Sequence, residues 1–247
     1  MLGLPDGVRA CLFDLDGVLT QTAKVHAAAW KEAFDGYLRK RADRGDEPFV
    51  EFDPGADYDE YVDGKPRYDG VRSFLAARGI HLPEGDPGDS PDAETICGIG
   101  NAKNDLVLAM IAHQGVEAYA GSVRYVRAAR AAGLATAVVS SSANAQAVLV
   151  AAGIDGLFDK RIDGHFAQRE HLPGKPAPDT FLAGARALSV QPSEAAVFED
   201  ALAGVAAGRA GHFAYVVGVD RVGQADALRK HGADTVVSDL AELIDTE

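Results

Sequence analysis

The sequence is poor in the residues that mark secreted, membrane-bound and nucleic-acid-binding proteins. Its two cysteines, Cys11 and Cys97, have no C-x-x-C spacing, which argues against a disulfide framework or a zinc site and favours a reducing cytoplasm. Only 24 lysines and arginines face 37 acidic residues, and the net charge of -13 argues against a nucleic-acid or anionic-membrane partner. No apolar run reaches membrane-spanning length, and the first residues do not resemble a signal peptide. We therefore expect a cytoplasmic protein, which we take to be a monomer.

The order of the expected strands and helices indicates an α/β fold with a helical insert. The 247 residues are 47% hydrophobic, which is enough for a large packed core. Apolar spacing predicts a strand over 8–14 and helices over 22–38, 68–78 and 104–113. The composition predicts a loop with a short helix over 39–63 and a loop over 82–92. Further helices are expected over 122–132, 144–152 and 225–230 and after 178 and 200, and strands over 134–139, 196–198, 213–217 and 235–237. We predict a doubly wound parallel-sheet core from 1–21 and 117–247, with a small α-helical cap domain over 22–116.

The most informative motif is Asp14-Leu15-Asp16-Gly17, which directly follows the first apolar run. Two acids separated by one residue in an extended segment point the same way. Like charges at that distance raise each other's pKa unless a cation or a proton relieves the repulsion. The motif therefore indicates a metal ion, a catalytic proton, or both.

Polar residues also follow the later strands. In a doubly wound sheet, ligands bind at the carboxyl ends of the strands, where we expect Asp14 and Asp16 to meet two other groups. The other groups are the run 140–144 and the pair Glu199 and Asp200. Carboxylates from two strand ends suit Mg²⁺, which prefers oxygen ligands and completes its shell with phosphate. We therefore predict one Mg²⁺ per active site.

Lys175 adds a positive charge near these acids and favours phosphoryl transfer, in which charge on the equatorial oxygens must be neutralised. We expect Asp14 to attack phosphorus as a nucleophile and Asp16 to act as general acid and base. Ser140 and the backbone N–H groups of Ser141 and Ser142 are expected to cradle an anion, with Asn144 as a further donor. Ser140 as a helix cap and Lys175 as a solvated loop residue are the structural alternatives.

Four spaced motifs together resemble the haloacid dehalogenase superfamily over nearly the whole chain. They are Asp14-Leu15-Asp16-Gly17-Val18, Val139-Ser140-Ser141-Ser142, Gly174-Lys175-Pro176-Ala177-Pro178-Asp179 and Phe198-Glu199-Asp200-Ala201-Leu202-Ala203-Gly204. Within it, the chain is similar to the β-phosphoglucomutase family, through Thr20-Gln21-Thr22-Ala23 with His26 and Trp30, Gly64-Lys65-Pro66-Arg67, and Lys103-Asn104-Asp105. The resemblance implies a phosphosugar substrate and a phosphorylated aspartate.

The resemblance also implies roles for individual residues. It places Mg²⁺ on Asp14, the Asp16 carbonyl and Asp200, with Glu199 in support. Ser140 and Lys175 would contact the transferring phosphoryl group. The implied substrate-binding residues are Thr22, His26, Gly64, Arg67, Lys103, Ser141, Ser142, Ala143 and Asn144.

Several functional alternatives stay open from the sequence. We expect a Mg²⁺-dependent β-phosphoglucomutase. A sugar-phosphate phosphatase would share every core residue, since the two differ only in whether a sugar hydroxyl or water attacks the aspartyl-phosphate. A non-catalytic phosphosugar-binding protein is a more distant alternative, because it would need neither Asp14 nor Asp16. A dinucleotide enzyme is rejected, because Lys103 takes the third glycine position after Gly98 and Gly100. Trp30 is expected to pack in the core of the cap.

Overall fold

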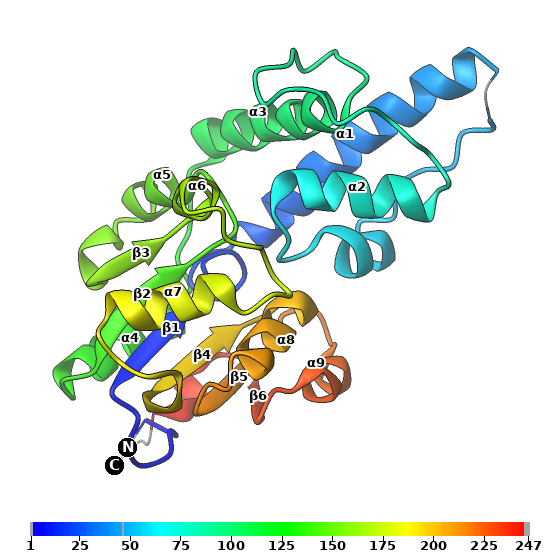
Figure 1. Cartoon of the computed structure of the whole chain (residues 1–247). Helices are drawn as coiled ribbons and strands as arrows, with labels where there is room; N and C mark the ends of the chain where they lie inside the picture. Colours follow the sequence, from blue (N-terminus) through cyan, green and yellow to red (C-terminus); the bar gives the residue numbers. More distant parts are fainter. Residues whose placement is uncertain (1, 46, 245–247) are drawn as a thin grey trace. The chain divides into compact units, whose positions relative to one another are not determined.

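The computed structural model describes residues 2–45 and 47–244, which form two compact units (Figure 1). Unit 1 comprises Met1–Thr22 and Val116–Glu247, and unit 2 comprises Ala23–Gly115. Every helix in the described part of the chain is too short or too polar to cross a membrane.

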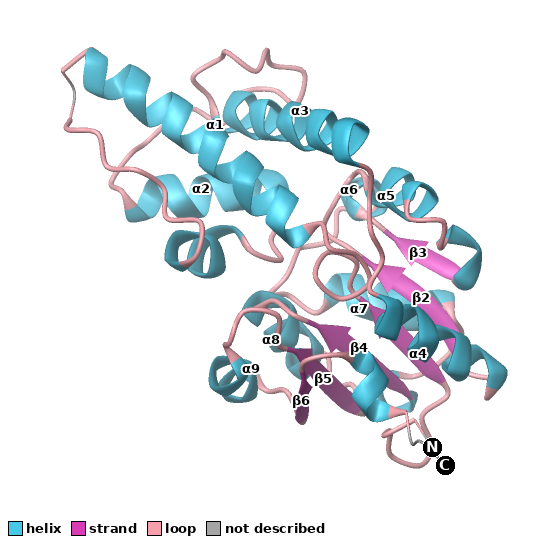
Figure 2. Cartoon of the chain, turned by 180° about the vertical axis from the view of Figure 1, so that it is seen from behind, coloured by secondary structure: helices cyan, strands magenta, loops and turns pink. Residues whose placement is uncertain are grey.

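Unit 1 is built on a six-stranded parallel sheet, drawn as arrows in Figure 2. The strands are β1 (Ala10–Phe13), β2 (Ala135–Val139), β3 (Lys160–Ile162), β4 (Ala195–Glu199), β5 (Tyr215–Val219) and β6 (Thr235–Val237). Their spatial order is β3-β2-β1-β4-β5-β6, so the direction of winding reverses between β1 and β4. In a sheet of this order, ligands bind at the carboxyl ends of the strands beside that reversal. The predicted doubly wound fold with a helical insert is confirmed.

Helices cover both faces of the sheet because the buried strand residues alternate between them. Leu12 packs in one apolar cluster with Phe181 of α7 (Asp179–Ala187), whereas the Phe13 ring meets Tyr125 of α4 (Ala120–Ala131) edge-on at 6.3 Å. α7 therefore lies on the near face in Figure 1, and α4 lies on the near face in Figure 2. The helices of unit 1 are α4 (Ala120–Ala131), α5 (Ala145–Ala151), α6 (Gly164–Arg169), α7 (Asp179–Ala187), α8 (Leu202–Ala210) and α9 (Ala225–His231).

Unit 2 is helical and has its own aromatic core. It contains α1 (Ala23–Asp43), the single π-helical turn Tyr58–Val62, α2 (Arg67–Ala77) and α3 (Ile96–Gln114). Phe34 is fully buried and lies at the centre, with ring centroids 4.9 Å from Trp30 and 4.2 Å from Phe74. Such ring contacts add to the stabilisation from apolar burial. Trp30 packs in this core, as predicted.

The two passages of the chain between the units run side by side within unit 1. Thr20 and Ala118 form an antiparallel bridge. The Gln21 N–H donates to the Glu117 carbonyl at 2.9 Å, and the Tyr119 N–H donates to the Leu19 carbonyl at 2.9 Å. These hydrogen bonds join the end of the first segment of unit 1 to the start of its second segment.

Some elements differ from the prediction. Strand β3 and helix α6 are present where none is predicted, and only Ile162 of the three β3 residues is buried, so the apolar pattern is too short to detect. Helix α3 begins at Ile96, earlier than the predicted 104. Thr95 caps it by accepting a hydrogen bond from the Gly98 N–H at 2.9 Å, and this cap offsets the weak helix propensity of the glycines that follow.

Candidate active site

Asp14 lies directly after β1 at the carboxyl edge of the sheet. All four β1 residues are fully buried, so this central strand holds Asp14 at a defined height between its neighbours. The Asp14 N–H donates to the Phe198 carbonyl of β4 at 2.9 Å, which extends the strand pairing by one residue. The residue as a whole is 7% exposed. The end of β1 thus fixes the position of one nearly buried acid.

Lys175 reaches the same point from the loop before α7. Its Nζ donates to Asp14 Oδ1 and to Glu199 Oε1, at 2.5 Å each, and to the Val139 carbonyl at 3.3 Å. The side chain is 1% exposed, and the Lys175–Pro176 peptide bond is cis. One buried ammonium therefore links the ends of β1, β2 and β4.

Burial and the neighbouring charges shift the pKa values of Asp14 and Lys175. Burial raises the pKa of Asp14 well above its usual range; Lys175 opposes the rise, and the charges of Glu199 and Asp16 add to it. For Lys175, burial lowers the pKa, but the charges of Asp14 and Glu199 outweigh burial and raise it. Lys175 is therefore cationic, and a further cation beside these acids would oppose the burial cost that raises the pKa of Asp14.

The carboxylates fit a hard divalent cation. Asp14, Glu199 and Asp200 each offer an oxygen within 4.8 Å of the others, and all three residues are buried. Gly17 allows this approach, because a Cβ at that position would lie 1.7 Å from Asp200 Oδ2. An all-oxygen donor group of this kind suits Mg²⁺. The Asp16 side chain is not part of this group.

Asp16 is held by the turn that follows it. Thr22 Oγ1 donates to Asp16 Oδ1, and Thr20 and Thr22 share a hydrogen bond between their hydroxyls at 2.7 Å. The Gly17 N–H donates to the Thr20 carbonyl at 2.8 Å, which closes the turn. Thr22, predicted to bind substrate, thus orients the carboxylate of Asp16 in this structure.

The Ser140 loop joins the end of β2 to α5. Ser140 is 2% exposed, and its Oγ accepts a hydrogen bond from the Ser142 N–H at 3.1 Å. The Ser142 Oγ in turn accepts from the Asn144 N–H at 3.1 Å. The predicted anion cradle is therefore a tight polar turn at the correct strand end. Two of its N–H groups are engaged within the turn itself. Ala143 lies in the same turn and is half-buried.

The predicted cap residues gather in two places within unit 2. Lys103 Nζ lies 2.8 Å from His26 Nδ1 and 4.8 Å from the centroid of the Trp30 ring. Arg67 stacks on the Tyr68 ring at 4.8 Å and donates from Nη2 to the Tyr68 hydroxyl at 3.1 Å.

Gly64, also predicted, lies in the turn before α2 with φ of +70°, a conformation that favours glycine.

Several residues outside the motifs make contacts that position the predicted site residues. The Tyr68 hydroxyl donates to Asn101 Oδ1 at 3.0 Å, and the Asn101 amide donates to the carbonyls of Pro87 and Asp89. In unit 1, Arg221 donates to the Gly17 carbonyl at 2.9 Å. No local sequence signal marks these residues, because each acts through a partner distant in the sequence.

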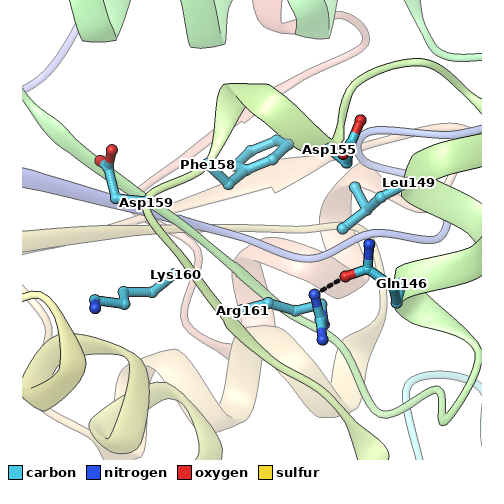
Figure 3. Close-up of a pocket in the computed structure, with 7 residues that line it drawn as sticks. All are labelled: Gln146, Leu149, Asp155, Phe158, Asp159, Lys160 and Arg161. Carbon is cyan, nitrogen blue, oxygen red and sulfur yellow. Dashed lines mark hydrogen bonds between the residues drawn. The ribbon is translucent and has the colours of Figure 1, made fainter.

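A pocket of about 190 Å³ elsewhere in unit 1 holds none of the predicted site residues (Figure 3). Arg161, which lines this pocket, donates to Gln146 Oε1 and, at 2.7 Å, to Asp163. The pocket lies among α5, β3 and the turn between them and is lined by Gln146, Leu149, Asp155, Phe158, Asp159, Lys160 and Arg161. The candidate active site is instead the cluster of Asp14, Glu199 and Asp200, where the winding reverses between β1 and β4.

Comparisons with known proteins show the family of the chain. The family model for haloacid dehalogenase-like hydrolases matches residues 8–212, which defines the class of the protein. Over 247 residues, 99% of the chain, the sequence is 58% identical to the β-phosphoglucomutase of Mycobacterium tuberculosis (strain CDC 1551 / Oshkosh) and covers 94% of it. It is 30% identical to the β-phosphoglucomutase of Bacillus subtilis (strain 168), over 96% of the chain and 92% of the relative. The chain therefore belongs to the haloacid dehalogenase-like hydrolases and, within them, to the β-phosphoglucomutase family.

The fold agrees with a solved structure of that family. The crystal structure of β-phosphoglucomutase from Clostridium difficile superposes with a TM-score of 0.75 at 25% sequence identity. The match covers 96% of this chain and 93% of the other. Both the sheet unit and the helical insert are thus shared along the whole length.

Proposed function

We propose that this protein is a Mg²⁺-dependent β-phosphoglucomutase that converts β-glucose 1-phosphate to glucose 6-phosphate through the 1,6-bisphosphate. The observation that carries the reaction type is the buried Asp14 carboxylate, paired with Lys175 at 2.5 Å beside two further buried acids. The 58% identical relative named β-phosphoglucomutase supports the choice of substrate.

Asp14 is the proposed nucleophile. One oxygen attacks phosphorus, the bond from phosphorus to the leaving sugar oxygen breaks, and an aspartyl-phosphate forms. Lys175, already hydrogen-bonded to Asp14 Oδ1, would move part of its bonding to the transferring oxygens as their charge develops. Ser140 lies at the end of the neighbouring strand and is proposed as a further donor to those oxygens.

Asp16 is the proposed general acid and base. In the first half of the cycle, it takes the proton of the 6-hydroxyl while that oxygen attacks the phosphorus of phospho-Asp14. In the second half, it returns a proton to the leaving O1 while Asp14 attacks the other phosphorus. The hydrogen bond from Thr22 keeps Asp16 pointing in one direction through both steps.

Asp14, Glu199 and Asp200 would hold the metal, and we include the Asp16 carbonyl on the strength of the family resemblance. When bound, Mg²⁺ neutralises negative charge on the phosphoryl group and lowers the repulsion that an anionic nucleophile meets. Such a cation also relieves the burial cost that raises the pKa of Asp14.

Unit 2 is proposed as the cap that binds the rest of the substrate. Arg67 would bind the distal phosphate, and His26 with Lys103 would contact the sugar. Gly64, Ser141, Ser142, Ala143 and Asn144 are proposed as further substrate contacts. The monomeric state and the cytoplasmic location remain predictions from the sequence.

The test supplies β-glucose 1-phosphate, Mg²⁺ and a trace of the 1,6-bisphosphate, and measures glucose 6-phosphate and free phosphate separately. Glucose 6-phosphate without matching phosphate release is the expected result. Phosphate release without isomerised sugar would replace the mutase by a sugar-phosphate phosphatase, which uses the same core residues. If neither glucose 6-phosphate nor free phosphate is formed, both enzymatic functions are contradicted.

A further inference from the structure

Arg221 lies in the loop between β5 and α9 and belongs to none of the motifs that mark the family. Its side chain is 15% exposed, and its guanidinium group stacks 3.6 Å above the centroid of the Tyr119 ring. Nε donates to the Gly17 carbonyl at 2.9 Å, and Nη1 donates to the Ser238 carbonyl at 2.6 Å. A planar, always charged fork held in this way is well suited to fixing carbonyl groups in place.

The position of the Gly17 carbonyl affects both Asp16 and Asp200. The Gly17 N–H already donates to the Thr20 carbonyl, so Arg221 restrains the second of the two peptide groups that flank Gly17. The Asp16 carbonyl belongs to the first of them. Gly17 also packs directly against the Asp200 carboxylate. A shift of this turn would therefore move Asp16 and disturb Asp200 together.

The same loop also restrains Asp200. Gln224 Nε2 donates to the Asp200 carbonyl at 3.0 Å. The loop is itself fixed, because Asp220 accepts hydrogen bonds from the N–H groups of Gly223, Gln224 and Ala225, at 2.7, 2.9 and 3.1 Å. A locally ordered segment thus reaches two separate acid-bearing turns.

We propose that the loop 220–225 is a clasp that aligns the Asp16–Gly17 turn with Asp200, and that Arg221 is its principal positioning residue. The inference rests on the proposed Mg²⁺ site of the preceding section. It assigns to Arg221 an effect on metal affinity and on the rigidity of the turn, without contact with the reacting atoms.

The test compares Arg221→Lys with a control, Arg130→Lys. Arg130 also ties a loop of unit 1 together, donating to the Thr136 hydroxyl, the Leu157 carbonyl and Asp159. Those partners lie before or at the beginning of β2 and β3, away from the carboxyl ends that carry the acids. Both variants keep the positive charge and lose the fork. Mg²⁺ affinity is measured by calorimetry, and amide hydrogen exchange is followed over 14–20 in metal-free protein.

Arg221→Lys is expected to weaken Mg²⁺ binding by about tenfold or more, the scale of a lost charged hydrogen bond, and to speed exchange over 14–20. Arg130→Lys should change neither, although both variants lower the melting temperature. A second pair isolates the stacking, since Tyr119→Leu should reproduce part of the effect and Tyr119→Phe should not. Wild-type exchange over 14–20 in Arg221→Lys would overturn the proposal.

Both readouts are taken without sugar phosphate, so they are separate from the test of the mutase reaction. Mg²⁺ binding by a wild-type protein that lacks mutase activity would refute the proposed function while leaving the clasp to be judged on its own. If the wild-type protein binds no Mg²⁺, the exchange comparison still decides whether Arg221 restrains the turn.

Discussion

Replacing Lys175 with methionine measures how far the buried acids depend on one cation. Lys175 contacts Asp14 and Glu199 at 2.5 Å each, and the three side chains are 1%, 10% and 0% exposed. Removing one partner of a buried ion pair costs about 3–5 kcal/mol, whereas an exposed pair contributes about 1 kcal/mol or less. We expect Lys175→Met to lower the unfolding free energy of unit 1 by about 3–5 kcal/mol near neutral pH without metal.

The loss should shrink as the pH falls. Burial and the charge of Glu199 raise the pKa of Asp14, and Lys175 opposes this rise. The Lys175→Met variant lacks that opposition. A carboxyl with a raised folded-state pKa contributes stability below its unfolded pKa, and this contribution is lost as the pH rises through the folded pKa. The variant should therefore be closer to the wild type in mild acid than at neutral pH.

Urea unfolding followed by circular dichroism is the suitable assay. The single tryptophan, Trp30, lies in unit 2, so its fluorescence would not report on the sheet. Arg9→Met, which breaks an exposed pair with Glu194 in the same unit, is the matched control. The double variant Lys175→Met/Glu199→Gln should regain part of the loss. A loss as small as that of Arg9→Met would refute the reasoning.

Three further outcomes are expected. Asp14→Asn should abolish turnover and leave the circular dichroism spectrum unchanged; turnover at the wild-type rate would rule out the phosphoaspartate route. Gly17→Ala, whose Cβ would lie 1.7 Å from Asp200 Oδ2 at a φ of +85°, should weaken Mg²⁺ binding in calorimetry, and wild-type affinity would contradict the close packing. For Asp220, burial raises the pKa, but hydrogen bonds from the N–H groups of the loop that follows outweigh it and lower the pKa. Asp220→Asn should cost about 1 kcal/mol near neutral pH after solvent screening. Because the folded pKa is lowered, the difference from wild type in thermal melts should fade as the pH drops through it, and a pH-independent difference would contradict this.

The chemistry of unit 1 could be predicted from the sequence because its residues follow buried strands. Asp14, Ser140 and Glu199 each come at or directly after the end of an apolar run, and parallel strands bring those ends to one edge. Local pattern and global topology point to the same place. Lys175 comes from a loop, and its approach to Asp14 could be expected only because the acids require a cation.

The contacts that align the site could not be predicted in this way. Arg221 acts on Gly17, which is separated from it by 204 positions, and Asn101 acts on Tyr68 across 33 positions. An arginine in a polar loop, like Arg221, or an asparagine on a helix, like Asn101, is usually solvated, so the residue types carry no signal. Strand β3 was missed for a different reason, since a three-residue edge strand with one buried side chain has no period to detect.

The bridge between Thr20 and Ala118 makes the helical insert a module with its ends tied together. The residues just before and just after Ala23–Gly115 are hydrogen-bonded to each other. The insert is therefore a loop whose two ends are held together within unit 1. Closing a longer loop costs only about 0.6 kcal/mol for each doubling of its length. The entropic cost of closing this loop therefore depends only weakly on the length of the insert. If unit 2 binds the sugar as proposed, the catalytic chemistry and the choice of substrate can vary as separate parts of one chain, joined by two connecting segments that pair at one bridge.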